Sequence, residues 1–232
     1  MEIQEYLSKL NNESQLIFQK TVLQKDKIGM MHHLSSCLFD LSNCIPDPQG
    51  KEMLETVCAQ LESATFTLTL GLYRQAFSSL RLALEMGLAA IYFSAHRVEL
   101  NEWIDGRIDI KWSRLVDEEN GVFSQRFTKA FCKDLTDDVN SYRIKAISVY
   151  RQLSEYVHGN NETWEFSSIK LSYKDELIEK YFESYSDATS VIIFATICRY
   201  ITIINSVDKE SLDFIPHEFH HIAAIRTMFG HS

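Results

Sequence analysis

The segment RQLSEYVHG (151–159) holds the two side chains whose types best suit chemistry on a phosphate group, Arg151 and His158. Histidine titrates near neutral pH and can accept or release a proton. Arginine stays charged and matches the geometry of phosphate oxygens. Cleavage of RNA without a metal needs a base for the ribose 2′-OH and a cation for the charge that builds on the phosphate. No acidic metal cage accompanies the pair, so the predicted chemistry uses no metal and no cofactor.

These side chains are predicted to lie at the end of a helix that spans 136–158. At 100° per residue, the apolar positions of its last turns fall within a stripe about 120° wide. That stripe comprises Ala146, Val149, Tyr150, Leu153, Tyr156 and Val157. Arg151 and His158 are seven residues apart, so we expect them nearly in line on the opposite face, separated by about 10 Å of rise. Ser154 and Glu155 lie between them, and Asn160 follows.

The pattern around this helix resembles that of the HEPN superfamily, a group of helical ribonuclease domains with an R-x4–6-H motif. A helix pair whose second member is YRQAFSSLRLALEMGLAAIYF precedes the motif helix, and another long helix follows, so the resemblance covers roughly residues 50–205. The resemblance implies a metal-independent endoribonuclease with Arg151 and His158 as the catalytic pair. Ser154, Glu155 and Asn160 are expected to be accessory residues.

Further expectations follow from the resemblance. In that superfamily two protomers usually bring their motifs together, so a homodimer is expected. Members often serve as toxins or antiviral-defence effectors, which implies an RNA substrate such as tRNA and an antitoxin or defence-complex partner. The rival interpretation is a non-catalytic HEPN-like interaction or dimerisation module. A helical nucleotide or ligand sensor is a third.

Other candidate residues have simpler explanations. Arg81 and Glu85 form an ordinary i, i+4 helix pair, although Glu85 would support Arg151 or His158 if the two helices pack side by side. A second Arg–His match, Arg226 with His231, lies at the C-terminal end, where fraying is expected. The sequence also contains a histidine cluster and three tryptophans: His217, His220 and His221; Trp103, Trp112 and Trp164. The histidines match no strong zinc signature, and tryptophans in loops more often cover a core edge than stack on bases.

Composition restricts the class of protein. The chain has 232 residues with a formal net charge of −9, which argues against broad, sequence-independent nucleic-acid binding. A local basic strip around Arg143, Lys145 and Arg151 would have to attract RNA. Five irregularly spaced cysteines without a CxxC pattern are typical of reduced cytoplasmic thiols. The apolar stretch 191–204 is too short to cross a bilayer and favours a buried helix, so no membrane association is expected.

The expected fold is all-α, an antiparallel helical bundle of about five long helices with an irregular insertion at 98–132. Only 3 Pro and 8 Gly interrupt the chain, which favours long helices over many short strands. We expect helices over 48–70, 73–96 and 174–205, with Gly71 marking a turn. The predicted organisation is an N-terminal helical extension (1–45), an HEPN-like bundle (46–207) and a C-terminal tail (208–232).

Overall fold

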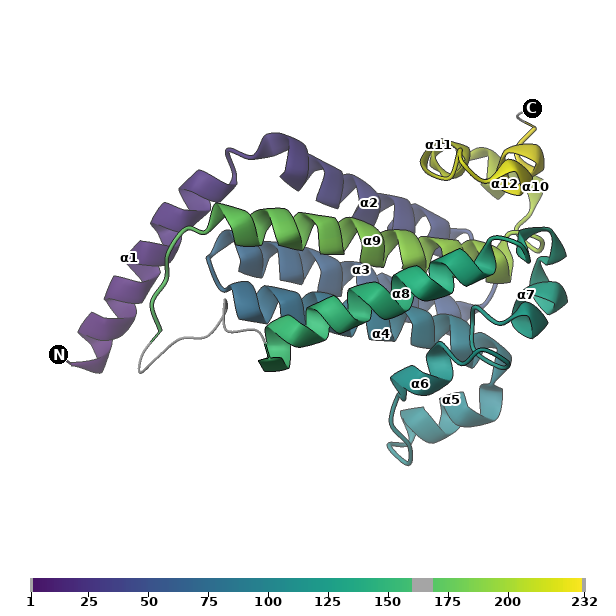
Figure 1. Ribbon diagram of the computed structural model, residues 1–232, viewed down its shortest axis with the longest axis horizontal. Helices are drawn as coiled ribbons and strands as arrows, with labels where there is room; N and C mark the ends of the chain where they lie inside the picture. Colours follow the sequence, from purple (N-terminus) through teal and green to yellow (C-terminus); the bar gives the residue numbers. More distant parts are fainter. Residues whose placement is uncertain (1, 160–168, 231–232) are drawn as a thin grey trace.

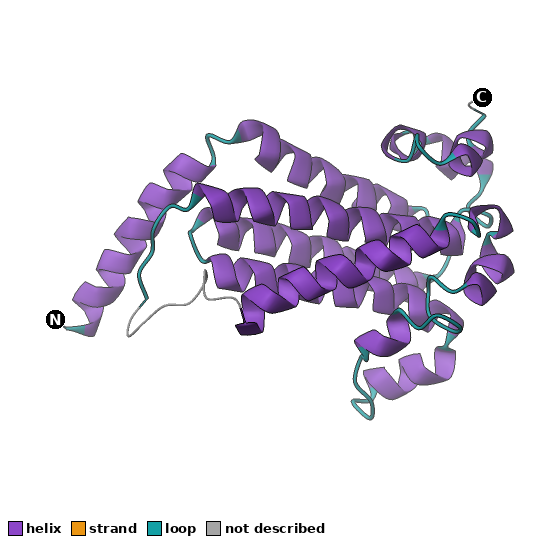
Figure 2. Ribbon diagram, in the orientation of Figure 1, coloured by secondary structure: helices purple, strands orange, loops and turns teal. Residues whose placement is uncertain are grey.

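The computed structural model describes residues 2–159 and 169–230, and these residues form helices, turns and loops without any strand. The predicted all-α class is therefore confirmed (Figure 2). Six long helices dominate it: α1 (Ile3–Thr21), α2 (Lys25–Asn43), α3 (Pro48–Thr69), α4 (Tyr73–Ala95), α8 (Val139–Ser154) and α9 (Asp175–Tyr200).

Helix α4 lies at the centre of the packing, because it contacts α3, α8 and α9. Helix α2 covers α3 and α9 on another side. Helix α8 packs on α4 and α9 and runs in the opposite direction to both, whereas α9 runs in the same direction as α4 (Figure 1). The C-terminal end of α8 consequently lies beside the N-terminal half of α4, and this placement determines which side chains can meet the Arg–His motif.

The turn between α3 and α4 is set by Gly71. Its φ of 78° is a left-handed conformation that side chains other than glycine rarely adopt. The amide of Gly71 bonds the carbonyl of Leu68 at 2.9 Å, and that of Leu72 bonds Thr67 at 3.3 Å. These two bonds form a Schellman ending, which satisfies the last carbonyls of α3 and reverses the chain. The turn predicted at Gly71 is confirmed.

The predicted irregular insertion consists of short helices at one end of the bundle (Figure 1). They are α5 (Arg97–Ile104), α6 (Trp112–Leu115), α7 (Gln125–Phe131) and the 3₁₀ turn η1 (Lys133–Leu135). Trp103 and Trp112 are partly buried against the core, as expected for aromatics that cover a core edge. Trp164 lies outside the described residues.

One hydrophobic core runs through nearly the whole structure. It includes Met31 and Leu38 of α2 as well as Ile215 and Phe219 near the C-terminus. The C-terminal segment forms three short helices: α10 (Ser206–Glu210), α11 (Phe214–Glu218) and α12 (Ala223–Met228). Helix α2, which belongs to the predicted N-terminal extension, buries its apolar face in the same core. The predicted tail is likewise docked by buried aromatic and aliphatic side chains.

The long apolar helices are core elements of the bundle. The stretch 191–204 belongs largely to α9, where Val191, Ile192 and Phe194 are fully buried. Among the described residues, one helix, Tyr73–Ala95, is long and apolar enough to cross a membrane by length and composition alone. Of its most apolar window, 67% is buried inside the structure, as in the core helix of a helical bundle.

Candidate functional site

Helix α8 presents the apolar stripe that its sequence predicts. Ala146, Val149, Leu153 and Tyr156 are almost fully buried, and Tyr150 is half-buried. Regular α-helix ends at Ser154 and is followed by a π-helical turn, η2 (Glu155–Gly159). Single π turns occur frequently at functional sites, and this one contains the motif histidine.

Arg151 and His158 take different partners. The Arg151 side chain is 82% exposed, and its Nε lies 3.4 Å from Oε1 of Glu155. His158, also exposed, has its Nε2 2.9 Å from Nη1 of Arg81 on α4. Among the described residues no hydrogen bond or ion pair joins Arg151 to His158. Each residue of a π turn advances by less than the 100° assumed for a regular helix, so His158 is rotated away from the line predicted through Arg151.

Three consecutive residues of the π turn contact α4. Tyr156 stacks on Phe77 with ring centroids 3.9 Å apart. The carbonyl of Val157 accepts a hydrogen bond from Nη2 of Arg74 at 2.7 Å. A carbonyl at a helix end has lost its partner within the helix, and Arg74 supplies one. His158 then meets Arg81, so α4 fixes the conformation of this end of α8.

Arg81 is held by a network of its own. Its Nη2 donates to the Tyr150 hydroxyl at 2.7 Å and lies 3.4 Å from Oε1 of Glu85. The guanidinium carbon lies 4.7 Å from the centroid of the Tyr150 ring, and that ring stacks on Trp112 at 3.9 Å. Burial and the nearby Glu85 carboxylate raise the pKa of Tyr150. Glu85 therefore reaches the motif through Arg81, and α6 of the insertion supports the same network.

Sequence reasoning considered support of the motif by Glu85 of the Arg81–Glu85 pair, but it did not predict that Arg74 and Arg81 themselves contact the end of α8. The available signal was their spacing: the two are seven apart, so they share one face of α4. The helix direction needed to bring that face to His158 is a property of the packing. Three arginines, Arg74, Arg81 and Arg151, thus lie on or beside the end of α8.

The predicted accessory residues act locally where they are described. The Ser154 hydroxyl donates to the Tyr150 carbonyl at 2.8 Å, and Glu155 pairs with Arg151. Asn160 lies outside the described residues.

The expected basic strip is largely neutralised. Arg143 bonds the carbonyl of Val116 at 2.9 Å and lies 3.6 Å from Glu118. Lys145 pairs with Asp187 at 3.0 Å. The cations of α8 that lead towards Arg151 are therefore matched by acids. Arg151 and Arg81 are also ion-paired, with Glu155 and Glu85 respectively.

The C-terminal histidines form no metal centre in the part of the chain that is described. His220 bonds the carbonyl of His217, and His221 lies 3.2 Å from the Tyr142 hydroxyl. Glu218 lies 3.3 Å from His33 of α2. His221 and Glu218 thus join the C-terminal helices to the bundle. His231 lies outside the described residues.

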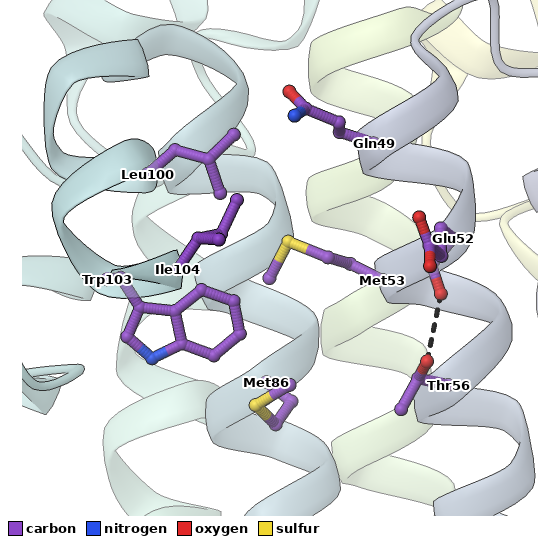
Figure 3. A pocket seen from close by; sticks show the side chains of 8 residues that line it. All are labelled: Gln49, Glu52, Met53, Thr56, Met86, Leu100, Trp103 and Ile104. Atoms are coloured by element: carbon purple, nitrogen blue, oxygen red, sulfur yellow. Dashed lines mark hydrogen bonds between the residues drawn. The ribbon is translucent and has the colours of Figure 1, made fainter. Parts of the chain in front are cut away.

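A cavity of about 380 Å³ lies between α3, α4 and α5 (Figure 3). Its wall is mainly apolar and includes Met53, Met86 and Trp103, with Glu52 as the one titratable group among its lining residues. The Thr56 hydroxyl beside it is already bonded to the Glu52 carbonyl at 3.0 Å. One exposed carboxylate does not supply an acid–base pair, so this cavity is a poorer candidate for chemistry than the end of α8.

Comparisons with protein families, curated proteins and solved structures find no match for this chain. The choice of site therefore depends on the geometry of the residues themselves. On that basis the end of α8 is the best candidate, because it combines an exposed imidazole, a bound guanidinium and an exposed arginine.

Proposed function

We propose that this protein is a metal-independent endoribonuclease of HEPN type, with His158 as the acid/base and Arg151 as the group that binds the scissile phosphate. The observation that carries the proposal is the placement of an exposed imidazole and an exposed arginine at one helix end, with a second guanidinium 2.9 Å from the imidazole. Such a set supplies proton transfer and charge stabilisation without a metal.

The proposed reaction balances with these groups alone. The unprotonated ring nitrogen of His158 takes the proton of the ribose 2′-OH while the 2′-oxygen attacks phosphorus. The bond from phosphorus to the 5′-oxygen breaks, and the imidazolium returns the proton to that departing oxygen. The products are a 2′,3′-cyclic phosphate and a 5′-hydroxyl. Arg151 stabilises the added negative charge on the non-bridging phosphate oxygens.

The proposal also includes the bundle, the oligomeric state, the biological role and the partners that the sequence predicts. The five long helices α2, α3, α4, α8 and α9 are taken as the functional bundle, antiparallel in the sense that successive long helices reverse direction. We propose a homodimer that brings two copies of the motif together, a role as a toxin or antiviral-defence effector in the cytoplasm, and an antitoxin or defence-complex partner. The substrate is taken to be RNA, for example tRNA.

The test is cleavage of total RNA and tRNA in EDTA. Wild type should leave 2′,3′-cyclic phosphate ends. His158→Ala and Arg151→Ala should each lower the rate by about 10²-fold or more, the range for loss of a general acid/base or a charge-stabilising donor. Far-UV circular dichroism should stay unchanged, because neither side chain is buried.

Matched controls separate the site from general surface effects. His32→Ala removes an exposed histidine on α2, and Arg107→Ala removes an exposed, ion-paired arginine of the insertion. Both should cleave like wild type. Equal cleavage by wild type and His158→Ala would refute the assigned site. Absence of cleavage, with dimerisation weakened by Arg151→Ala, would instead support the alternative, a non-catalytic interaction module.

A further inference from the structure

The contact between Arg81 and His158 defines the protonation of the imidazole. A guanidinium carries only donors, so Nη1 of Arg81 must donate and Nε2 of His158 must accept. The imidazole in this contact is therefore neutral, with its proton on Nδ1. The lone pair of Nε2 is occupied by Arg81 and is not free to take a proton from another group.

The partners of Arg81 fix its guanidinium in this position. Tyr150 accepts one hydrogen bond from Nη2, Glu85 lies beside the same nitrogen, and the Tyr150 ring lies against the guanidinium plane. The third nitrogen, Nε, is buried and has no partner among the described residues. Buried donors are rarely left unpaired. Arg81 is an exception, because part of its hydrogen-bonding capacity is unused in this arrangement.

We propose that Arg81 controls His158: it withholds Nε2 in the resting state and releases it when a phosphate group binds the guanidinium. The inference deepens the proposed function and rests on it for its biological meaning. Phosphate carries negative charge on several acceptor oxygens, so it attracts the guanidinium electrostatically and can accept from two of its N–H groups at once. A neutral imidazole offers one uncharged acceptor, so phosphate competes favourably with it for Nη1 of Arg81.

Arg151 has a different role in this scheme. Its side chain is 82% exposed and forms an ion pair with Glu155. It meets a phosphate without disturbing His158. Loss of Arg151 should weaken anion binding and leave the resting imidazole unchanged, whereas loss of Arg81 should change the imidazole itself.

The test is ¹⁵N NMR of the histidine rings in the full-length protein, with His158 assigned from the signals lost in His158→Gln. At a pH where the imidazole is neutral, wild type and Arg151→Ala should show His158 with its proton on Nδ1. Arg81→Ala should show a mixture of the two tautomers. Arg81→Lys keeps a donor of similar reach, so it should retain the Nδ1 proton. Added inorganic phosphate should shift the His158 Nε2 signal in wild type and leave it unchanged in Arg81→Ala.

Each outcome is decisive. The same tautomer mixture in wild type and Arg81→Ala would overturn the inference, as would a His158 signal in wild type that phosphate does not move. These readings need no catalysis. If the protein does not cleave RNA but gives the expected spectra, the proposed function is rejected and the control of His158 by Arg81 stands. If it cleaves RNA without those spectra, the proposed function stands and the control by Arg81 is rejected.

Discussion

Replacing Gly87 by alanine should destabilise the bundle, although alanine is the better helix former. A Cβ at Gly87 would lie 2.8 Å from Cγ1 of Ile192, and 2.9 Å from both its Cδ1 and its Cγ2. Isoleucine in a helix has one strongly preferred χ1 rotamer, so no single rotation relieves all three contacts. Gly87 therefore allows α4, the helix that carries Arg74 and Arg81, to approach α9 closely.

The magnitude follows from two opposing effects. Overpacking a core costs about 1–3 kcal/mol of stability. Because three contacts are this short, we expect a cost in the upper half of that range, about 2–3 kcal/mol. The helix propensity of alanine returns about 1 kcal/mol. We expect a net loss of about 1–2 kcal/mol in the free energy of unfolding, equivalent to a fall of roughly 2–8 °C in Tm for a chain of this size.

Gly29 is the matched control. It lies within α2, and a Cβ there would meet nothing within 4 Å. Gly29→Ala should therefore stabilise the protein by about 0.5–1 kcal/mol. Urea unfolding followed by circular dichroism at 222 nm measures both variants. In an Ile192→Ala background, the further change Gly87→Ala should no longer destabilise, because the three contacting atoms are gone. Gly87→Ala as stable as wild type would refute the proposed close packing.

Two further predictions concern titratable groups outside the motif. Burial, together with His220 and Lys145, lowers the pKa of His221 from its usual 6.5. Below about pH 6.5 the unfolded chain therefore binds more protons at this position, and stability falls as pH falls. The midpoint urea concentration of unfolding should fall between pH 7 and pH 5, and it should fall less in His221→Gln than in wild type. An equal fall in both proteins would contradict this prediction. Burial raises the pKa of Cys58 to about 12, whereas Cys44 is half-buried. A thiol reagent should therefore label Cys44 first. If the fast phase of the labelling reaction persists in Cys44→Ser, that order is wrong.

The sequence determines the helices and their buried faces. Ala146, Val149 and Leu153 recur at helical spacing and are buried as predicted. Apolar residues at that spacing lie on one face of a helix, and burying that face removes all of them from water. Gly71 predicts a turn because no other residue adopts its left-handed φ at comparable cost. The all-α class follows from the same local rules.

Tertiary structure decides what the motif histidine contacts. The spacing of Arg151 and His158 predicts one line of polar groups, but the π turn rotates His158 towards α4, where Arg81 meets it. Neither the π turn nor the direction of α4 is encoded in the nine residues of the motif. Phe77 and Arg74 of α4 contact the π turn, and Trp112 stacks on Tyr150, only after these distant segments pack together. Local periodicity sets which side of a helix is buried, whereas the partner of an exposed side chain is set by whichever helix packs beside it.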